Sequence, residues 1–166
     1  MTARRRWKEG RDKRERGRFL ALPYAVLTSR AYLSLSPHAV KLLIDLGVQY
    51  NGRNNGDLGV AWRLMSLRGW RSEETLAKAK RELLHTQLIV ETRKGWRPNR
   101  ASLYALTFFA LDYCDGKLDI ASAGFPYGAW KLMERLSLPM TIARNHTGNA
   151  QKNAALTTPV VVEAPG

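Results

Sequence analysis

Basic side chains recur at helical spacing in the middle of this 166-residue sequence. Arg71, Lys78 and Arg81 fall on one side of a helix expected to begin at Ser72, and Thr75 lies beside them. Cationic and small polar side chains in one such stripe suit contacts with phosphates and base edges in the major groove of DNA. The alternative is a solvated helix face without a partner, because surface helices commonly carry charged residues on their outer side.

A second cationic group surrounds an aromatic residue further along the chain. Trp96 is flanked by the cations Lys94, Arg97 and Arg100. The turn-forming residues of the same segment are Gly95, Pro98 and Asn99. Three cations around an aromatic ring on an exposed loop suit contacts with phosphates or with a minor groove. Alternatively, Trp96 folds back over the core, since tryptophan is usually largely buried.

Three helices are expected to position the first stripe. The first begins at Ser36-Pro37, where serine suits the N-cap and proline suits the first helical position, and it ends near Tyr50. Its expected apolar face consists of Val40, Leu43, Ile44 and Val48. The many turn formers of residues 51–57 then predict a loop.

The second expected helix covers residues 58–67. Its inward side chains are predicted to be Val60, Leu64 and Leu67, with Trp62 and Met65 adjacent. It ends within residues 68–71, where Gly69 suits the left-handed conformation that closes a helix. Trp62 and Trp70 are expected in the core. Because only a short turn precedes the next helix, the two helices are predicted to form a helix-turn-helix.

The third helix carries the stripe. Ser72 suits its N-cap, and Glu73 and Glu74 favour the positive end of the helix. Its core-facing side chains are expected to be Leu76, Ala79, Leu83 and Leu84, opposite a stripe that continues to His85. Strands are predicted at residues 88–93 and 101–108, which the segment 94–100 joins as a hairpin.

This order of elements resembles the winged helix-turn-helix of DNA-binding proteins. The resemblance rests on RGWRSEETLAKAKRELL (residues 68–84), the strand QLIVETR and the wing KGWRPNR. The pattern S-x-x-T-L-x-x-A-x-x-E-L-L before L-I-V is similar to such regulators and to the winged domains of plasmid and phage replication initiators. Residues 19–35 are similar to the same mobile-element proteins, so the resemblance covers about residues 19–110. One departure is Thr86-Gln87, where such proteins usually carry glycine, and this leaves the end of the helix open.

The charge of the chain favours a polyanionic partner. The net charge is +13 and the pI is about 10.4, which suits nucleic acid first and an anionic membrane surface second. Residues 1–18 carry nine Arg or Lys and three Asp or Glu with almost no apolar side chains, so we expect a disordered basic arm. This arm either follows phosphates or is only a solvated tail. An export signal is disfavoured, because acids interrupt the basic stretch and Pro23 splits the apolar one.

Motifs typical of enzymes are missing from the sequence. It has no P-loop, H-E-x-x-H, G-x-S-x-G or C-x-x-C. Asp112, Asp115 and Asp119 are a weak metal signal, since three acids alone seldom make a site. His38 and His85 are expected at the surface or in packing. We therefore expect no enzyme activity, no catalytic residue, no metal and no cofactor.

The last part of the chain has fewer signals. Residues 111–136 are expected to hold a short helix with Trp130, Met133 and Leu136 on one side, which packs on the domain or, alternatively, on a second subunit. Residues 137–166 are expected to form a flexible tail. The single cysteine, Cys114, is expected to be inert; it excludes an internal disulfide and favours a reducing compartment.

The sequence thus predicts a mainly α protein with a small β-hairpin (α+β), in which a winged helix-turn-helix covers residues 19–113. An arm (1–18), an extension (114–136) and a tail (137–166) complete the chain. We expect a cytoplasmic, sequence-specific double-stranded DNA-binding protein that regulates transcription or initiates replication of a bacterial mobile element, with a homodimer as one option. A winged-helix protein-interaction module and an RNA-binding protein are the alternatives. The expected DNA contacts are Arg71, Ser72, Thr75, Lys78, Arg81, Lys94, Trp96, Arg97 and Arg100.

Overall fold

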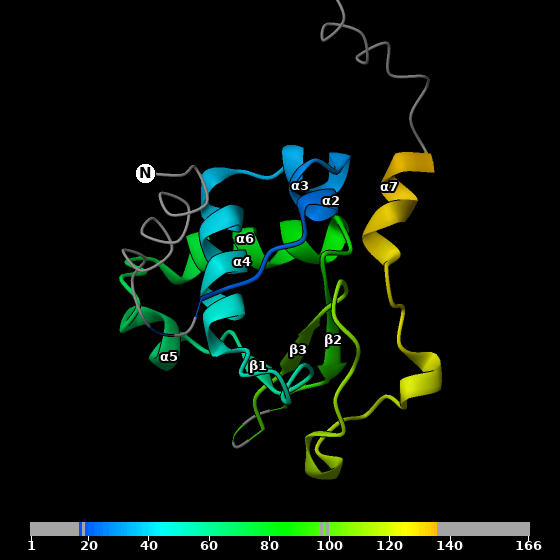
Figure 1. Cartoon of the computed structure of the whole chain (residues 1–166). Helices are drawn as coiled ribbons and strands as arrows, with labels where there is room; N and C mark the ends of the chain where they lie inside the picture. Colours follow the sequence, from blue (N-terminus) through cyan, green and yellow to red (C-terminus); the bar gives the residue numbers. More distant parts are fainter. Residues whose placement is uncertain (1–16, 18, 97, 99, 136–166) are drawn as a thin grey trace, which may run out of the picture. The chain divides into compact units, whose positions relative to one another are not determined.

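A computed structural model describes residues 17, 19–96, 98 and 100–135 of the chain. Its longer elements are α4 (Pro37–Gln49), α6 (Glu73–His85), β2 (Ile89–Arg93) and β3 (Leu103–Leu106). The shorter ones are α2 (Tyr24–Leu27), α3 (Arg30–Leu33), β1 (Leu58–Gly59), α5 (Trp62–Ser66) and α7 (Leu132–Arg135). Helices accompany a small antiparallel sheet (Figure 1), so the predicted α+β class is confirmed. The predicted arm, Gly17 excepted, and the predicted tail lie outside the described residues.

The start of α4 is as predicted. The Ser36 hydroxyl accepts a hydrogen bond from the Ala39 N–H at 3.3 Å, and Pro37 occupies the first helical position. The predicted apolar face is only partly right, because Leu43 is buried whereas Val48 is exposed. The buried side of α4 is made of Ala39, Leu42, Leu43 and Leu46. Since α4 is apolar around much of its circumference, its neighbours and not its periodicity decide which side is covered.

The core lies between α4, α6 and the sheet. α4 packs on α6, whose inward side chains are Leu76, Ala79 and Leu83, and Leu84 is partly buried against the same cluster. These are the residues that the periodicity of the third helix predicts. Trp70 is buried and Trp62 is partly buried against the core, so both tryptophans pack as expected.

The predicted helix at residues 58–67 is wrong in its first half. Leu58 and Gly59 form β1, and Leu58 is fully buried opposite Tyr104 of β3. Only Trp62–Ser66 is helical, and its buried residue is Met65, whereas Leu67 is 85% exposed and Leu64 is also exposed. A short apolar run fits a strand as well as a helix, and the pairing with β3 decides in favour of the strand.

The predicted hairpin is confirmed, with shorter strands than expected. β2 and β3 are antiparallel, with Ile89 opposite Leu106, and β1 adds to the free edge of β3 in the order β1-β3-β2. The register shifts between Glu91 and Arg93, an irregularity of the kind that bends a strand locally. The sheet thus fixes the two ends of the segment that joins β2 to β3.

The segment after β3 returns to the helices. It holds short 3-10 turns at Cys114–Gly116, Ser122–Gly124 and Ala129–Lys131, followed by α7. Trp130 is buried and Met133 packs against the core, as the prediction of packing within the chain requires, and Leu136 lies outside the described residues. No helix among residues 19–135 is long and apolar enough to cross a membrane.

Candidate nucleic-acid interface

The exposed side of α6 carries the predicted stripe. At its start, the Ser72 hydroxyl accepts a hydrogen bond from the Thr75 N–H at 3.3 Å, which caps the helix as expected. Lys78, Arg81 and His85 are exposed on the side opposite the buried leucines, and Arg71 is exposed just before the helix. The orientation of the stripe is therefore confirmed. Its contact with DNA stays a prediction.

One acid shares the stripe with these cations. Lys78 Nζ lies 2.7 Å from a carboxylate oxygen of Glu74, one helical turn earlier, and both side chains are well exposed. An exposed pair at this spacing contributes only about 0.3–0.5 kcal/mol, so a competing phosphate displaces Glu74 at little cost. From the sequence, Glu74 is expected only as a favourable charge at the helix start, and its pairing with Lys78 is visible only in the structure.

The turn before α6 is held by a buried carboxylate of α4. Asp45 is 5% exposed and accepts hydrogen bonds from Lys41 Nζ at 2.7 Å, Arg68 Nε at 2.9 Å and Trp70 Nε1 at 2.8 Å. Lys41 Nζ also donates to the Arg68 carbonyl at 2.9 Å. Gly69 adopts the predicted left-handed conformation, with φ of +81°. The turn between α5 and α6 is therefore held against α4 on both sides of this glycine.

The same contacts set the ionisation of Asp45. Burial alone raises the pKa of this carboxyl, but the hydrogen bonds from Lys41, Trp70 and Arg68 together outweigh it and hold the pKa below its ordinary value. The cluster therefore contains a carboxylate at neutral pH. It also occupies Lys41 and Arg68, so these two cations position the turn instead of offering free charge.

A second carboxylate joins α6 to the start of α4. Glu82 accepts a hydrogen bond from the Ser36 hydroxyl at 2.7 Å and another from the Ser36 N–H. At the other end, α6 stops at His85, and Gln87 takes a positive φ of +55° where the related pattern usually has glycine. The Thr86 hydroxyl bonds back to the Glu82 carbonyl at 3.1 Å, which closes the helix without a glycine.

Hydrogen bonds and close packing hold the described residues at the tip of the hairpin. The backbones of Trp96 and Arg100 exchange hydrogen bonds of 2.9 and 3.0 Å, which extends the pairing beyond the strands. A side chain at Gly95 would lie 2.6 Å from the Ser102 nitrogen and 2.7 Å from the Arg100 carbonyl, so only glycine fits there. The predicted contacts Lys94 and Trp96 are exposed, whereas Arg97 lies outside the described residues.

Asp119 contacts both Lys94 and Arg100 at this tip, and the contact of Arg100 with DNA stays a prediction. Its carboxylate pairs with the Arg100 guanidinium and accepts a hydrogen bond from the Lys94 N–H at 2.9 Å. The Lys94 hydrogen bond and the positive charges of Arg100 and Arg93 keep the pKa of Asp119 below its ordinary value. Arg100 is thus engaged within the chain, and its guanidinium lies 4.1 Å from the centroid of the Trp96 ring. Trp96 points outward and does not cover the core.

Two of the three acids that gave a weak metal signal make hydrogen bonds within the chain. Asp112 accepts a hydrogen bond from the Asn55 N–H at 2.8 Å, and Asp119 braces the hairpin tip. Within the described ranges, no group of three or more His, Cys, Asp or Glu side chains is arranged to hold a metal ion. Cys114 is buried, and burial, with the nearby charges of Asp57 and Asp112, raises the pKa of its thiol.

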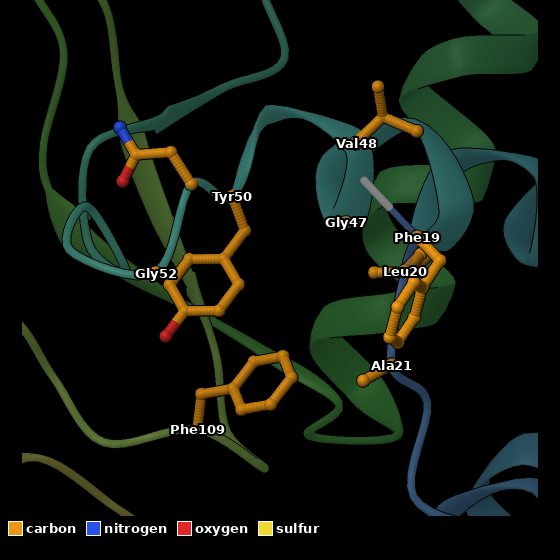
Figure 2. A pocket seen from close by; sticks show the side chains of 9 residues that line it. Phe19, Leu20, Ala21, Gly47, Val48, Tyr50, Gly52 and Phe109 are labelled. Atoms are coloured by element: carbon orange, nitrogen blue, oxygen red, sulfur yellow. The ribbon is translucent and has the colours of Figure 1, made fainter. Parts of the chain in front are cut away.

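An open apolar pocket of about 530 Å³ lies at the end of α4. Figure 2 shows Phe19, Leu20 and Ala21 on one side and the stacked rings of Tyr50 and Phe109 on the other. The ring centroids of Tyr50 and Phe109 are 4.7 Å apart. A methyl group at Gly47 would lie 2.8 Å from the Leu20 side chain. The absence of a side chain at Gly47 therefore lets Leu20 pack closely against α4.

Comparisons with known proteins give limited similarity. No model of a known protein family matches the sequence, and no curated protein matches it. A solved structure described as the N-terminal domain of a DNA-binding protein is 22% identical, with a TM-score of 0.34; the match covers 64% of this chain and 80% of that one. A structure of a Rep–DNA complex is 18% identical, with a TM-score of 0.35 and coverage of 84% and 98%.

Proposed function

We propose that this chain binds double-stranded DNA through a winged helix-turn-helix, with α6 in the major groove and the hairpin tip on the adjacent backbone. The observation that carries the proposal is the exposed stripe Arg71, Lys78 and Arg81 on a helix whose other side is anchored in the core. Thr75 and the N-cap Ser72 stand at the end of α6 that would meet base edges. Lys94 supplies an exposed cation on the hairpin tip.

The proposed role is sequence-specific binding without catalysis. The resemblance in residues 19–110 favours transcriptional regulation or initiation of replication on a bacterial mobile element. In vitro selection of bound DNA from a random pool would define the target, and a palindromic result would support a homodimer. Competition between duplex DNA and duplex RNA of equal length separates this function from RNA binding. If the selection enriches no DNA sequence and the chain prefers duplex RNA, the proposal is refuted.

The substitution Lys78→Ala tests the stripe. If Lys78 reads a base, binding to the selected site should weaken by about 1–3 kcal/mol, and preference at one base position should relax. If it contacts a phosphate, affinity for all sequences should fall together and the salt dependence should become shallower. Electrophoretic shifts across a salt series measure both quantities.

Arg53→Ala is a matched control, because Arg53 is an exposed cation in the loop between α4 and β1, outside α6 and the hairpin. It should change affinity less than Lys78→Ala does. Equal effects of the two variants would mean that only net charge matters and that α6 has no special place in binding.

A further inference from the structure

Trp96 is the most exposed tryptophan among the described residues, at 60%. The Arg100 guanidinium lies 4.1 Å from the centroid of its ring, and the residue remains mostly exposed to solvent. A cation over the face of an indole is attracted to the ring electrostatically. Arg100 is therefore a partner for the Trp96 ring on one side, while the residue as a whole stays exposed.

Several contacts restrain the backbone that carries the Trp96 ring. The paired backbones of Trp96 and Arg100, the close packing at Gly95 and the two contacts of Asp119 all restrain the same few residues. The Arg100 side chain is therefore held beside the ring and would have to leave Asp119 to reach a phosphate. An aromatic surface held ready in this way loses little conformational freedom when a flat ligand stacks on it.

A nucleobase suits the chemistry of the site. Every base has a π-face, and an aromatic side chain beside cations is the usual platform for bases of single strands. Exposed Lys94 lies two residues before Trp96 and offers a charge for the accompanying phosphate. Bases inside a duplex have both faces covered by their neighbours, so only an unpaired base presents a free face.

We propose that Trp96, backed by Arg100, is a stacking site for one unpaired nucleobase of DNA. This inference rests on the proposed function in one respect: α6 holds a duplex while the hairpin tip takes a base from the strand that leaves it. The preferred ligand is then a junction between duplex and single strand. Such a junction arises where a duplex is opened or gapped.

The test uses the full-length chain and two DNA probes: a blunt hairpin duplex carrying the selected site, and the same hairpin with a single-stranded oligothymidine extension. The wild-type chain should bind the extended probe more tightly. Trp96→Ala should remove this advantage, so its loss on the extended probe should exceed its loss on the blunt probe by about 5- to 150-fold. Trp96→Phe should keep most of the advantage, because phenylalanine also stacks.

Fluorescence gives an independent reading. The extension should quench tryptophan emission of the wild-type chain more than that of Trp96→Phe, which retains the other four tryptophans of the sequence. Equal quenching in the two proteins would overturn the proposal. Equal losses of Trp96→Ala on both probes would also overturn it, since they would place the ring in the duplex or in the scaffold.

The experiment distinguishes failure of the stacking site from failure of duplex binding. If the wild-type chain binds neither duplex but binds free oligothymidine in a manner that requires Trp96, the stacking site stands and the duplex function falls. If Trp96→Ala changes nothing on either probe, the stacking site falls and the duplex function stands. Circular dichroism of each variant establishes that it is folded, and Trp96→Phe provides the comparison if the alanine variant is not.

Discussion

Removing the Asp45 carboxylate should loosen the turn between α5 and α6. Asp45 is the common acceptor for Lys41, Arg68 and Trp70, and it joins α4 to the turn that leads into α6. Asp45→Ala leaves all three donors without this acceptor. Asp45→Asn keeps an oxygen for the Trp70 N–H and loses the charge, so the two variants separate the hydrogen bond from the ion pairs.

The expected magnitudes follow from the exposure of each partner. The buried Trp70 N–H would lose its acceptor in Asp45→Ala, which costs about 1–3 kcal/mol. The side chains of Lys41 and Arg68 are 41% and 31% exposed, so water partly replaces their interaction with Asp45. The loss of each ion pair therefore adds about 0.5–1 kcal/mol to the destabilisation. We therefore expect Asp45→Ala to lower the free energy of unfolding by about 2–5 kcal/mol and Asp45→Asn by about 1–2 kcal/mol.

Urea denaturation followed by circular dichroism measures both values, with Glu91→Ala as the control for an exposed carboxylate on β2. The control should change stability by about 0.5 kcal/mol or less. The pH dependence gives a second reading, because the pKa of Asp45 is lower in the folded chain than its ordinary value of 3.8. Its contribution is therefore complete above pH 3.8 and is lost as the pH falls through the lower folded value.

The difference in stability between the wild-type chain and Asp45→Asn should thus shrink in acid. A constant difference between pH 6 and pH 2 would show that charge has no part in the clamp. A loss below about 0.5 kcal/mol for Asp45→Ala would refute the reasoning altogether, because it would mean that the three donors find equivalent partners without this carboxylate.

Two further substitutions test other parts of the domain. Glu74→Gln removes the acid beside Lys78, and we expect DNA affinity to rise by about 2- to 5-fold at low salt, measured by electrophoretic shift; weaker binding would place Lys78 away from the phosphates. Asn55→Ala removes a fully buried amide that accepts from the Leu106 N–H and donates to three carbonyls, so the free energy of unfolding should fall by about 2–4 kcal/mol in urea. A change under 0.5 kcal/mol would show that water replaces the amide there.

The elements that local chemistry specifies could be predicted from the sequence. Both long helices begin at a serine N-cap, and Gly69 takes the left-handed conformation expected between them. The error at residues 58–67 has a non-local cause. Leu58 is a strand residue because Tyr104 pairs with it, and that partner lies far along the chain. A window of neighbouring residues does not contain this information.

The candidate interface could likewise be predicted only in part. The outward orientation of Lys78 and Arg81 follows from helical spacing, which the sequence displays directly. The bracing of Arg100 by Asp119 could not be predicted, because nineteen positions separate the two residues and only the folded hairpin brings them together. The clamp at Asp45 was missed for the same reason, since Arg68 and Trp70 belong to a different element.

The distribution of ion pairs leads to a final prediction about the N-terminal segment. From the turn before α6 through the hairpin, the exposed described cations are Arg71, Lys78, Arg81 and Lys94. Four phosphate contacts would give a log–log salt slope of about −3.6. If the chain makes about six to eight contacts, with a slope of roughly −5 to −7, the remainder must come from elsewhere, and residues 1–18 carry nine cations.

Deleting residues 2–18 should therefore bring the slope to about −3.6 and weaken binding to all sequences alike. Electrophoretic shifts on the selected site and on a scrambled duplex, each between 50 and 200 mM salt, measure both effects. An unchanged slope would mean that the domain neutralises the phosphates without this segment. A loss confined to the selected site would mean that the segment reads bases, because phosphate contacts carry no direct sequence information.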